Sequence, residues 1–369
     1  MGGDVLSDRA LNRATLERQL LLRRADRTPE SVVEHLVGLQ AQVPHDPYLG
    51  LWSRVDGFRP DDVSSLLLDR RLVRIVVMRG TIHLVTAADA GVLRPLVQRV
   101  LDQELARHSE YAAPLEGVDL DPVLAAAREL LAEPRTGPQL RGLLGERFPG
   151  VDAAALAYAC RCKLPLVQVP PRGLWGRGAQ VTSATLEAWT GQPVAPTPSV
   201  DDVVLRYFAA FGPATTADVA TWSRLTGLRE VVDRLTPRLR TFHDERGRAL
   251  LDLPDAPRPD PDTPAPPRFL PEYDNALLSH ADRTRFVGED APRLFTARER
   301  AHGTVLVDGM LQAVWRLARA DDGAATLTVT HAERLTRRRL SALGAEGRRM
   351  VRFLAADATE RDVRLVRAP

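Results

Sequence analysis

Cysteine and long apolar runs are scarce in this sequence. Its only two cysteines are Cys160 and Cys162, and one C-x-C pair without a second pair excludes a disulfide framework and a structural zinc site. No apolar run approaches the roughly 20 residues of a membrane span. Residues 1–4 show no basic segment followed by an apolar one, as a secretory signal would require. We therefore expect a cytoplasmic protein with no membrane partner.

The common cofactor and metal motifs are absent as well. The sequence contains no phosphate-binding P-loop, no dinucleotide fingerprint after a predicted strand and no H-E-x-x-H. Its eight histidines are scattered, and none pairs with cysteine or a second histidine at the spacing of metal ligands. We predict a protein that uses neither a cofactor nor a metal.

Lysine is almost missing. Lys163 is the only lysine among 50 basic residues, and the net charge is only +2. Arginine makes bidentate contacts with phosphate better than lysine does, although a GC-biased genome would give the same preference without selection for function. With the overall charge near zero, a nucleic-acid surface must come from local clusters of arginine.

What the sequence does contain is one order of elements that occurs three times: helices followed by a β-hairpin. In the first copy, helical patterns at 8–24, from 28 to near Pro44, at 48–54 and at 60–70 precede β-rich segments at 72–78 and 81–85. The order returns at 121–183 and at 200–253. Helices followed by a hairpin are typical of a winged helix, so we predict an α+β protein with three tandem winged-helix units.

A proline-rich linker separates these units from a different C-terminal region. Seven of the fourteen residues from 254 to 267 are proline, which favours a stiff, extended chain. Beyond it, β-rich segments at 304–307, 313–317 and 326–329, with a hairpin turn at Asp308-Gly309, predict a small sheet or partial barrel. The predicted domains are 1–117, 118–198 and 199–255 for the three units, 256–267 for the linker, and 268–369 for a β-rich region with a basic helix that ends near Leu343.

Two segments of the C-terminal region allow more than one interpretation. The arginines between 334 and 352 fit a solvated helix face better than a binding surface. The polar and aromatic cluster at 269–283 either docks this region onto the winged helices or lines a cleft.

Gln40 and Gln42 form an unusual pair beside apolar residues and just before Pro44. Proline biases the preceding residue away from the helical region, so the helix should end here. In an extended segment residues i and i+2 point the same way, and two carboxamides facing one volume suit a bound water or sugar hydroxyl. Spacing alone favours the simpler interpretation, in which both side chains satisfy backbone groups at the helix end.

Two stretches without acidic residues, 70–88 and 160–183, indicate hairpins that face phosphate. For His83, a hydrogen-bonded position within the hairpin is as consistent with the pattern as a place in a site. The residues predicted to contact DNA are Arg79, His83, Arg161, Lys163, Arg172, Trp175 and Arg177.

A series of short motifs along nearly the whole chain resembles the AlkZ-type winged-helix DNA glycosylases, a superfamily that includes the YcaQ branch. The resemblance implies a C-shaped protein that excises alkylated bases, including those in interstrand crosslinks, and a catalytic motif of Gln, an apolar residue, then Gln or Asp. Here that motif is Gln40-Ala41-Gln42, the Gln version found in the AlkZ branch. The series comprises 38–42, 50–54, 79–84, 269–274, 307–309 and 315–316.

The resemblance therefore makes Gln40 and Gln42 the predicted catalytic residues and outweighs the simpler interpretation of the pair. It implies a glycosylase that acts on duplex DNA containing N7-alkylated or crosslinked purines. We also expect a monomer that is monofunctional, because strand cutting needs an amine that forms a Schiff base and Lys163 is the only lysine. The resemblance also implies self-resistance to an alkylating natural product such as azinomycin B. Two other classes remain open: a non-catalytic winged-helix regulator of transcription, and a protein-interaction scaffold.

Overall fold

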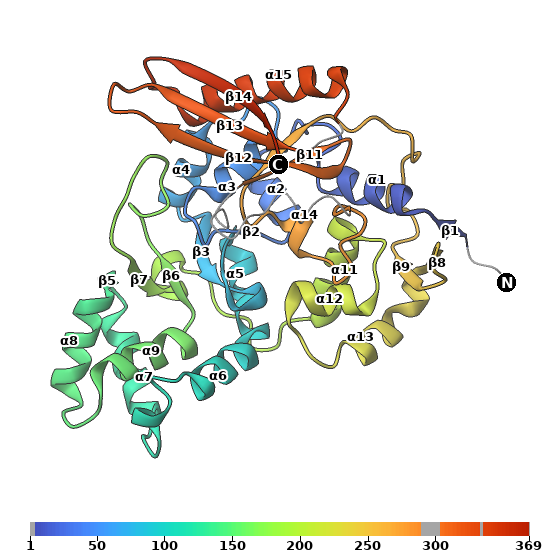
Figure 1. Cartoon of the computed structure of the whole chain (residues 1–369). Coiled ribbons are helices and arrows are strands. Elements are labelled where there is room, and N and C mark those ends of the chain that lie inside the picture. Colours follow the sequence, from blue (N-terminus) through green and yellow to red (C-terminus); the bar gives the residue numbers. More distant parts are fainter. Residues whose placement is uncertain (1–3, 289–302, 333–334, 369) are drawn as a thin grey trace.

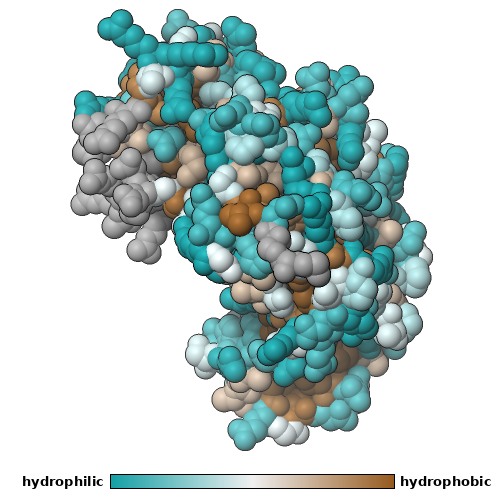
Figure 2. Space-filling view, turned by 90° about the vertical axis from the view of Figure 1, so that its right-hand side faces the viewer, coloured by the Kyte–Doolittle hydropathy of each residue, from teal (hydrophilic) through white to brown (hydrophobic). Residues whose placement is uncertain are grey.

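The computed structural model of the chain describes residues 4–288, 303–332 and 335–368. In Figure 1 the C-terminal sheet and its helix lie at the top, the second repeat at the lower left and the third repeat at the lower right. The side view in Figure 2 shows a curved outline that is hollowed on one side. Of the helices in the described ranges, none combines the length and apolar character needed to cross a membrane.

The first repeat follows the expected order, but its second helix is shorter than predicted. Thr28 caps that helix and Pro29 is its first residue, as the sequence indicates, yet the helix ends at His35 rather than near Pro44. The elements are α1 (Asp8–Arg18), α2 (Pro29–His35), β2 (Leu39–Gln40), α3 (Asp46–Trp52), α4 (Pro60–Leu68), β3 (Leu72–Val76), a 3-10 turn (Met78–Gly80) and β4 (Ile82–Thr86). Two helices that the sequence did not reveal, α5 (Ala87–Leu96) and α6 (Gln98–Arg107), lead to the second repeat.

The second and third repeats both consist of three helices followed by a hairpin, and the second has an additional short strand and helix. Thr136 and Asp152 cap α8 and α9 through their side-chain oxygens, which fixes where each helix starts. The second repeat consists of α7 (Asp121–Leu130), β5 (Arg135–Thr136), α8 (Gly137–Arg147), α9 (Ala153–Lys163), β6 (Leu166–Gln168), β7 (Thr182–Thr185) and α10 (Leu186–Thr190). The third consists of α11 (Val200–Phe211), α12 (Thr216–Ser223), α13 (Leu228–Leu235), β8 (Arg240–Asp244) and β9 (Ala249–Asp252), with β1 (Val5–Leu6) parallel to β8.

The hairpins of the first two repeats belong to one six-stranded sheet. Its order is β2-β4-β3-β6-β7-β5, and Arg74 of β3 lies opposite Gln168 of β6. Residue patterns along the chain gave no sign of this pairing, because it joins the edges of two hairpins far apart in sequence. It places the glutamine strand β2 and the second repeat on the same sheet.

The C-terminal region is an open five-stranded sheet in the described residues, with order β10-β11-β12-β13-β14, so the expected sheet is confirmed and the partial barrel is not. The basic helix continues to Leu354, well past the predicted end at Leu343, because Leu343, Met350 and Val351 form one buried face. The elements are β10 (Arg268–Leu270), α14 (Asn275–Leu278), β11 (Gly303–Val307), β12 (Met310–Arg319), β13 (Ala325–His331), α15 (Arg337–Leu354) and β14 (Arg361–Arg367).

Buried ion pairs fasten the segment after the linker to the first repeat. Arg54 donates to both carboxylate oxygens of Asp274 at 2.7 and 2.8 Å, and neither side chain is exposed. A second buried pair, between Arg18 and Asp252 of β9, fastens α1 to the third repeat. Removing one partner of such a pair typically costs about 3–5 kcal/mol. Residues 269–283 therefore dock the C-terminal region, and Glu272 within them also lines a cleft.

Candidate active site and nucleic-acid interface

A left-handed turn directs the chain from α2 into the glutamine strand. Val37 and Gly38 have φ values of 55° and 95°, and a side chain at position 38 would meet Val85 Cγ1 at 2.7 Å, so only glycine fits. Gln40 then pairs with His83 of β4, and the Ala41 N–H donates to the Ile82 carbonyl at 2.7 Å. The predicted extended conformation is confirmed at Gln40, where it begins earlier than Pro44 implied, but Gln42 lies in a bend beyond β2.

The Gln40 side chain is held in one orientation by Arg79. Gln40 is 7% exposed, and its Oε1 accepts a hydrogen bond from Arg79 Nη2 at 2.7 Å. Because a guanidinium has no acceptor, the carbonyl oxygen must face Arg79, which leaves the Gln40 amide N–H groups for another partner. Arg79 also donates to the Trp222 carbonyl at 3.1 Å, so the third repeat braces this contact.

Burial lowers the pKa values of two residues that surround Gln40. It lowers the pKa of Arg79 to about 10, with Arg224 nearby adding to the effect, and Arg79 has no ion pair in the described part of the chain. Burial, and then the charge of Arg79, lower the pKa of His83 to about 3. His83 is therefore neutral: its Nδ1 donates to the Thr81 carbonyl at 3.0 Å and its Nε2 accepts from Arg79 at 3.3 Å.

Gln42 lies in a more open position than Gln40. Its side chain is exposed, and its Oε1 accepts from the Ile82 N–H at 3.5 Å, the long limit of a hydrogen bond. The two glutamines thus flank the start of β4. Gln40 is buried and its carbonyl group is fixed, whereas the carbonyl group of Gln42 is only weakly held.

Gln42 also lines a cleft of about 570 Å³ between the first and second repeats. We call it the arginine cleft, because three arginines of the second repeat contribute to its wall. The sequence patterns did not single out two of them, Arg135 and Arg141. Arg135 directly precedes Thr136, which caps α8, so a positive side chain and the start of a helix together favour an anion at this position. The lining includes Gln42, Arg135, Thr136, Arg141, Tyr158 and Arg161.

The predicted DNA contacts of the second repeat lie in different settings. Arg161 is in the arginine cleft, half exposed, over the Tyr158 ring and 3.1 Å from Glu104. Lys163 lines a separate cavity and pairs with Asp102 at 2.7 Å. Arg172 donates to the Ala179 carbonyl at 2.9 Å within its own loop. Arg177 in the same loop is exposed.

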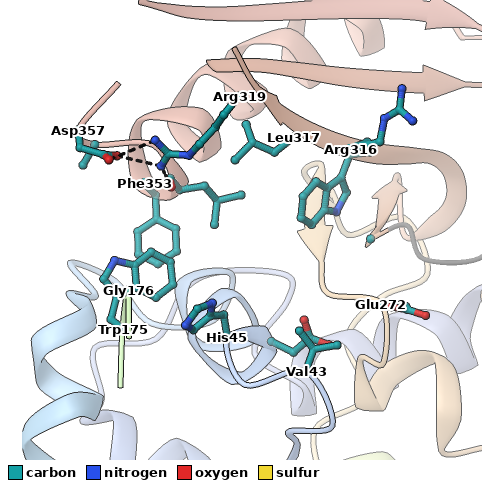
Figure 3. Close-up of a pocket in the computed structure, with 15 residues that line it drawn as sticks. Val43, His45, Trp175, Gly176, Glu272, Arg316, Leu317, Arg319, Phe353 and Asp357 are labelled. Carbon is teal, nitrogen blue, oxygen red and sulfur yellow. Dashed lines mark hydrogen bonds and ion pairs between the residues drawn. The ribbon is translucent and has the colours of Figure 1, made fainter. Parts of the chain in front are cut away.

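Trp175 lies in a second cleft, of about 720 Å³, under the C-terminal sheet (Figure 3). We call it the aromatic cleft. The indole centroid is 5.5 Å from that of His45 and 5.1 Å from that of Phe353. Glu272 and Asp46 are also in the wall, and burial together with nearby Glu272 and Asp274 raises the pKa of Asp46 to about 7. The residues that define the cleft are Val43, His45, Asp46, Trp175, Glu272, Trp315 and Phe353.

The structure thus brings Gln40, Arg79 and His83 into one hydrogen-bonded group and places Gln42 at the edge of a cleft that contains Arg161. Lys163, Arg172 and Arg177 lie apart from that group. In the described ranges no group of three or more histidine, cysteine, aspartate or glutamate side chains is arranged to hold a metal ion.

Comparisons with known proteins agree on one family. The family model described as DNA glycosylase AlkZ-like matches residues 33–353. An "Interstrand DNA cross-link repair glycosylase" from Streptomyces sahachiroi is 24% identical over 257 residues, and the match covers 64% of this chain and 64% of that relative. The solved structure of the Streptomyces sahachiroi DNA glycosylase AlkZ matches with a TM-score of 0.72 and 21% identity, over 98% of this chain and 100% of that one. At that identity the structural likeness shows the fold alone.

Proposed function

The chain belongs to the AlkZ-like DNA glycosylase family, and from that premise we propose that it is a monofunctional DNA glycosylase. Its substrate would be duplex DNA with N7-alkylated purines, including purines joined in interstrand crosslinks, and its biological role self-resistance to an alkylating product such as azinomycin B. We further propose that the three repeats act as winged helices and that the protein works as a monomer. The observation that carries the proposal is the fixed orientation of Gln40 beside the exposed carboxamide of Gln42.

The orientation of Gln40 gives the two glutamines different roles in the proposed reaction. An N7-alkylated purine carries a positive charge, so it leaves with the electrons of the glycosidic bond and needs no acid. Gln40 Nε2 donates to the attacking water, and Gln42 Oε1 accepts one of its protons in a hydrogen bond. The water oxygen then bonds to C1′, and its proton passes to solvent. Neither carboxamide acts as a general base; both position the water, and the Gln42 carbonyl oxygen complements the positive charge that develops on the sugar.

The arginine cleft supports DNA as the partner. Arg135, Arg141 and Arg161 lie around Gln42, and arginine in such a cleft suits the phosphates that flank a damaged nucleotide. We propose that Arg161, Arg177 and Trp175 contact DNA directly. Arg79 and His83, which are buried around Gln40, would act through Gln40.

The test is incubation with a duplex that contains 7-methylguanine, followed by measurement of free base and of abasic strand. The wild-type protein should release the base. Gln40→Ala and Gln42→Ala should each raise the barrier by about 2–4 kcal/mol, as loss of one preorganised group does, with little change in duplex affinity. Binding without any base release would instead favour the transcriptional regulator. Full activity in the double variant would remove both glutamines from the mechanism.

A further inference from the structure

The proposed mechanism leaves the aromatic cleft unused, although the cleft begins one residue after Gln42. Val43, His45 and Asp46 form its floor, and Glu272 and Phe353 line it from other segments. A chain extends by at most about 3.6 Å per residue, so His45 lies within about 11 Å of Gln42 along the backbone. The floor of this cleft therefore follows directly on the glutamine segment.

The wall of the cleft holds a tryptophan in a fixed position. Trp175 packs against His45 and Phe353, and Tyr48 lies 5.2 Å from it on centroids. The Tyr48 hydroxyl donates to the Gly173 carbonyl at 2.8 Å, which ties this ring to the loop that carries the indole. An aromatic surface fixed in this way suits stacking of a planar group.

The polar groups of the cleft are mainly acidic. Asp46 Oδ2 is buried and has no hydrogen-bond partner within the described ranges. Neither Asp46 nor Glu272 forms an ion pair there, whereas Asp357 at the rim is paired with Arg319 at 2.8 Å. The exposed Arg316 directs its guanidinium away from the cleft in Figure 3. The carboxyl groups of Asp46 and Glu272 thus have no positively charged partner in the described residues, although Asp46 interacts with the Tyr273 backbone and Glu272 with the Tyr273 side chain.

We propose that the aromatic cleft binds a planar, positively charged purine, the alkylated base of a monoadduct, which unlike a crosslinked base is free to leave the stack, by stacking on Trp175 and by attraction to Asp46 and Glu272. This inference rests on the proposed function, because it assigns the site for the reacting base. A cation over an indole face is a favourable pair, and a volume of about 720 Å³ is ample for one base. A neutral guanine would stack equally well but would gain nothing from the two carboxyl groups, so the cleft selects for charge.

The test is a calorimetric titration with nucleosides at pH 6.5, where 7-methylguanosine is positively charged, guanosine is neutral and Asp46, with a pKa of about 7, gives up its proton as the cation binds. The wild-type protein should bind 7-methylguanosine at least ten-fold more tightly than guanosine. The double variant Asp46→Asn/Glu272→Gln should lose this preference. Trp175→Ala should bind both nucleosides more weakly, and Trp175→Phe should restore the affinity for both. Asp357→Asn, which changes a carboxylate already paired with Arg319, is the matched control and should bind as the wild-type protein does.

Equal affinity for the two nucleosides, or an unchanged preference in the double carboxamide variant, would overturn the inference. Gln40→Ala/Gln42→Ala should keep nucleoside binding while losing base release, so the titration and the release assay report on the two proposals separately. The Asp46→Asn/Glu272→Gln protein should also release 7-methylguanine at least ten-fold more slowly. Loss of nucleoside binding with a wild-type release rate would show that the cleft does not hold the reacting base.

Discussion

Arg79 determines which end of the Gln40 carboxamide faces the substrate. Replacing it with methionine removes the donor that holds Gln40 Oε1, so the amide can rotate. Loss of a hydrogen bond from a charged group typically costs about 1.5–3 kcal/mol, and we expect single-turnover base release by Arg79→Met to fall roughly ten- to hundred-fold. Duplex affinity, measured in parallel, should change much less.

The conservative variant Arg79→Lys is the control for a merely structural effect. Lysine can still donate to Gln40, so it should restore most of the release rate even though it loses the second contact to Trp222. Equal reduction of rate and affinity in Arg79→Met, without rescue by lysine, would show that Arg79 serves binding rather than orientation.

The carboxyl group of Asp46 should make stability depend on pH. Its folded pKa is about 7 against an ordinary value of 3.8, so between about pH 4 and pH 7 the unfolded chain has lost a proton that the folded protein retains. The free energy of unfolding therefore falls as pH rises through this window. The shift is about 3 units, and at about 1.4 kcal/mol per unit the loss is at most about 4 kcal/mol.

Asp46→Asn removes this titration, so its stability should fall less between pH 4.5 and 7.5 than that of the wild-type protein. Urea unfolding at the two pH values measures the difference, which we expect to be on the order of 2–4 kcal/mol. The same substitution at the exposed Asp56 should leave the wild-type pH dependence in place. Parallel behaviour of Asp46→Asn and wild type would mean that Asp46 is ionised throughout.

The sequence predicted the glutamine pair in an extended segment but not the environment of its neighbours. Pro44 and the spacing of the two glutamines placed Gln40 correctly in an extended segment, but they did not predict that Gln42 lies in a bend, exposed where Gln40 is buried. For His83 they left the hydrogen-bonded position open beside the functional one, and the structure supports the former, because the side chain is 1% exposed. The burial of Arg79 depends on contacts with α12 and Gln40, which come from distant parts of the chain.

Element boundaries were predictable where a cap or proline marks them and were misplaced elsewhere. Thr28, Thr136 and Asp152 cap their helices as expected, since capping is a local interaction. The end of α2 was misplaced because the left-handed turn at Val37 and Gly38 depends on close packing against Val85. The end of α15 was misplaced because Gly344 and Gly347 look like helix breakers, yet Gly347 allows close packing on β14: a side chain there would meet Val363 Cγ1 at 3.0 Å.

The loop between β6 and β7 is the element most open to phosphate contact. Arg177 there is exposed and makes no ion pair in the described part of the chain, and Arg161 faces the arginine cleft. Affinity for undamaged duplex should fall steeply with salt, and Arg177→Ala and Arg161→Ala should each reduce the slope by roughly one unit. Filter binding or anisotropy at several salt concentrations measures this.

Two further variants make the salt experiment specific. Arg23→Ala alters an arginine that is 84% exposed and outside both clefts, so its slope should match the wild type. Arg172 was predicted to contact phosphate as well, but it braces the Ala179 carbonyl, so Arg172→Ala should act through the loop and change the slope by less than Arg177→Ala. A salt-insensitive affinity in the wild-type protein would place the loop away from DNA.

At the scale of the whole molecule, residues 42–46 contribute to two clefts, one lined by arginines and one by aromatic and acidic side chains. The arginine cleft uses the second repeat, and the aromatic cleft uses the C-terminal sheet and α15. The sheet that joins the first two repeats and the buried Arg54–Asp274 pair hold both clefts in place. Local sequence patterns reveal the repeats, whereas these long-range pairings follow only from the folded chain.

This arrangement bears on whether the protein cuts the strand after removing the base. A glycosylase that does so forms a Schiff base through an amine, and arginine stays protonated and cannot serve. Lys163 is the only lysine, and its ammonium is paired with Asp102 at 2.7 Å, in a cavity that does not include Gln42. The described residues that line the arginine cleft with Gln42 include no lysine, so hydrolysis is the expected route.

Borohydride added during the reaction should therefore trap no protein–DNA adduct above the level seen with Lys163→Arg, and the product should be an intact abasic strand. Lys163→Arg keeps the pairing with Asp102 and should release base at nearly the wild-type rate. Asp102→Asn, which frees the ammonium, provides the stricter control, because it should still give no adduct if distance from Gln42 is what excludes attack. A strong adduct that disappears in Lys163→Arg would overturn the hydrolytic mechanism and move the reacting centre to the end of α9.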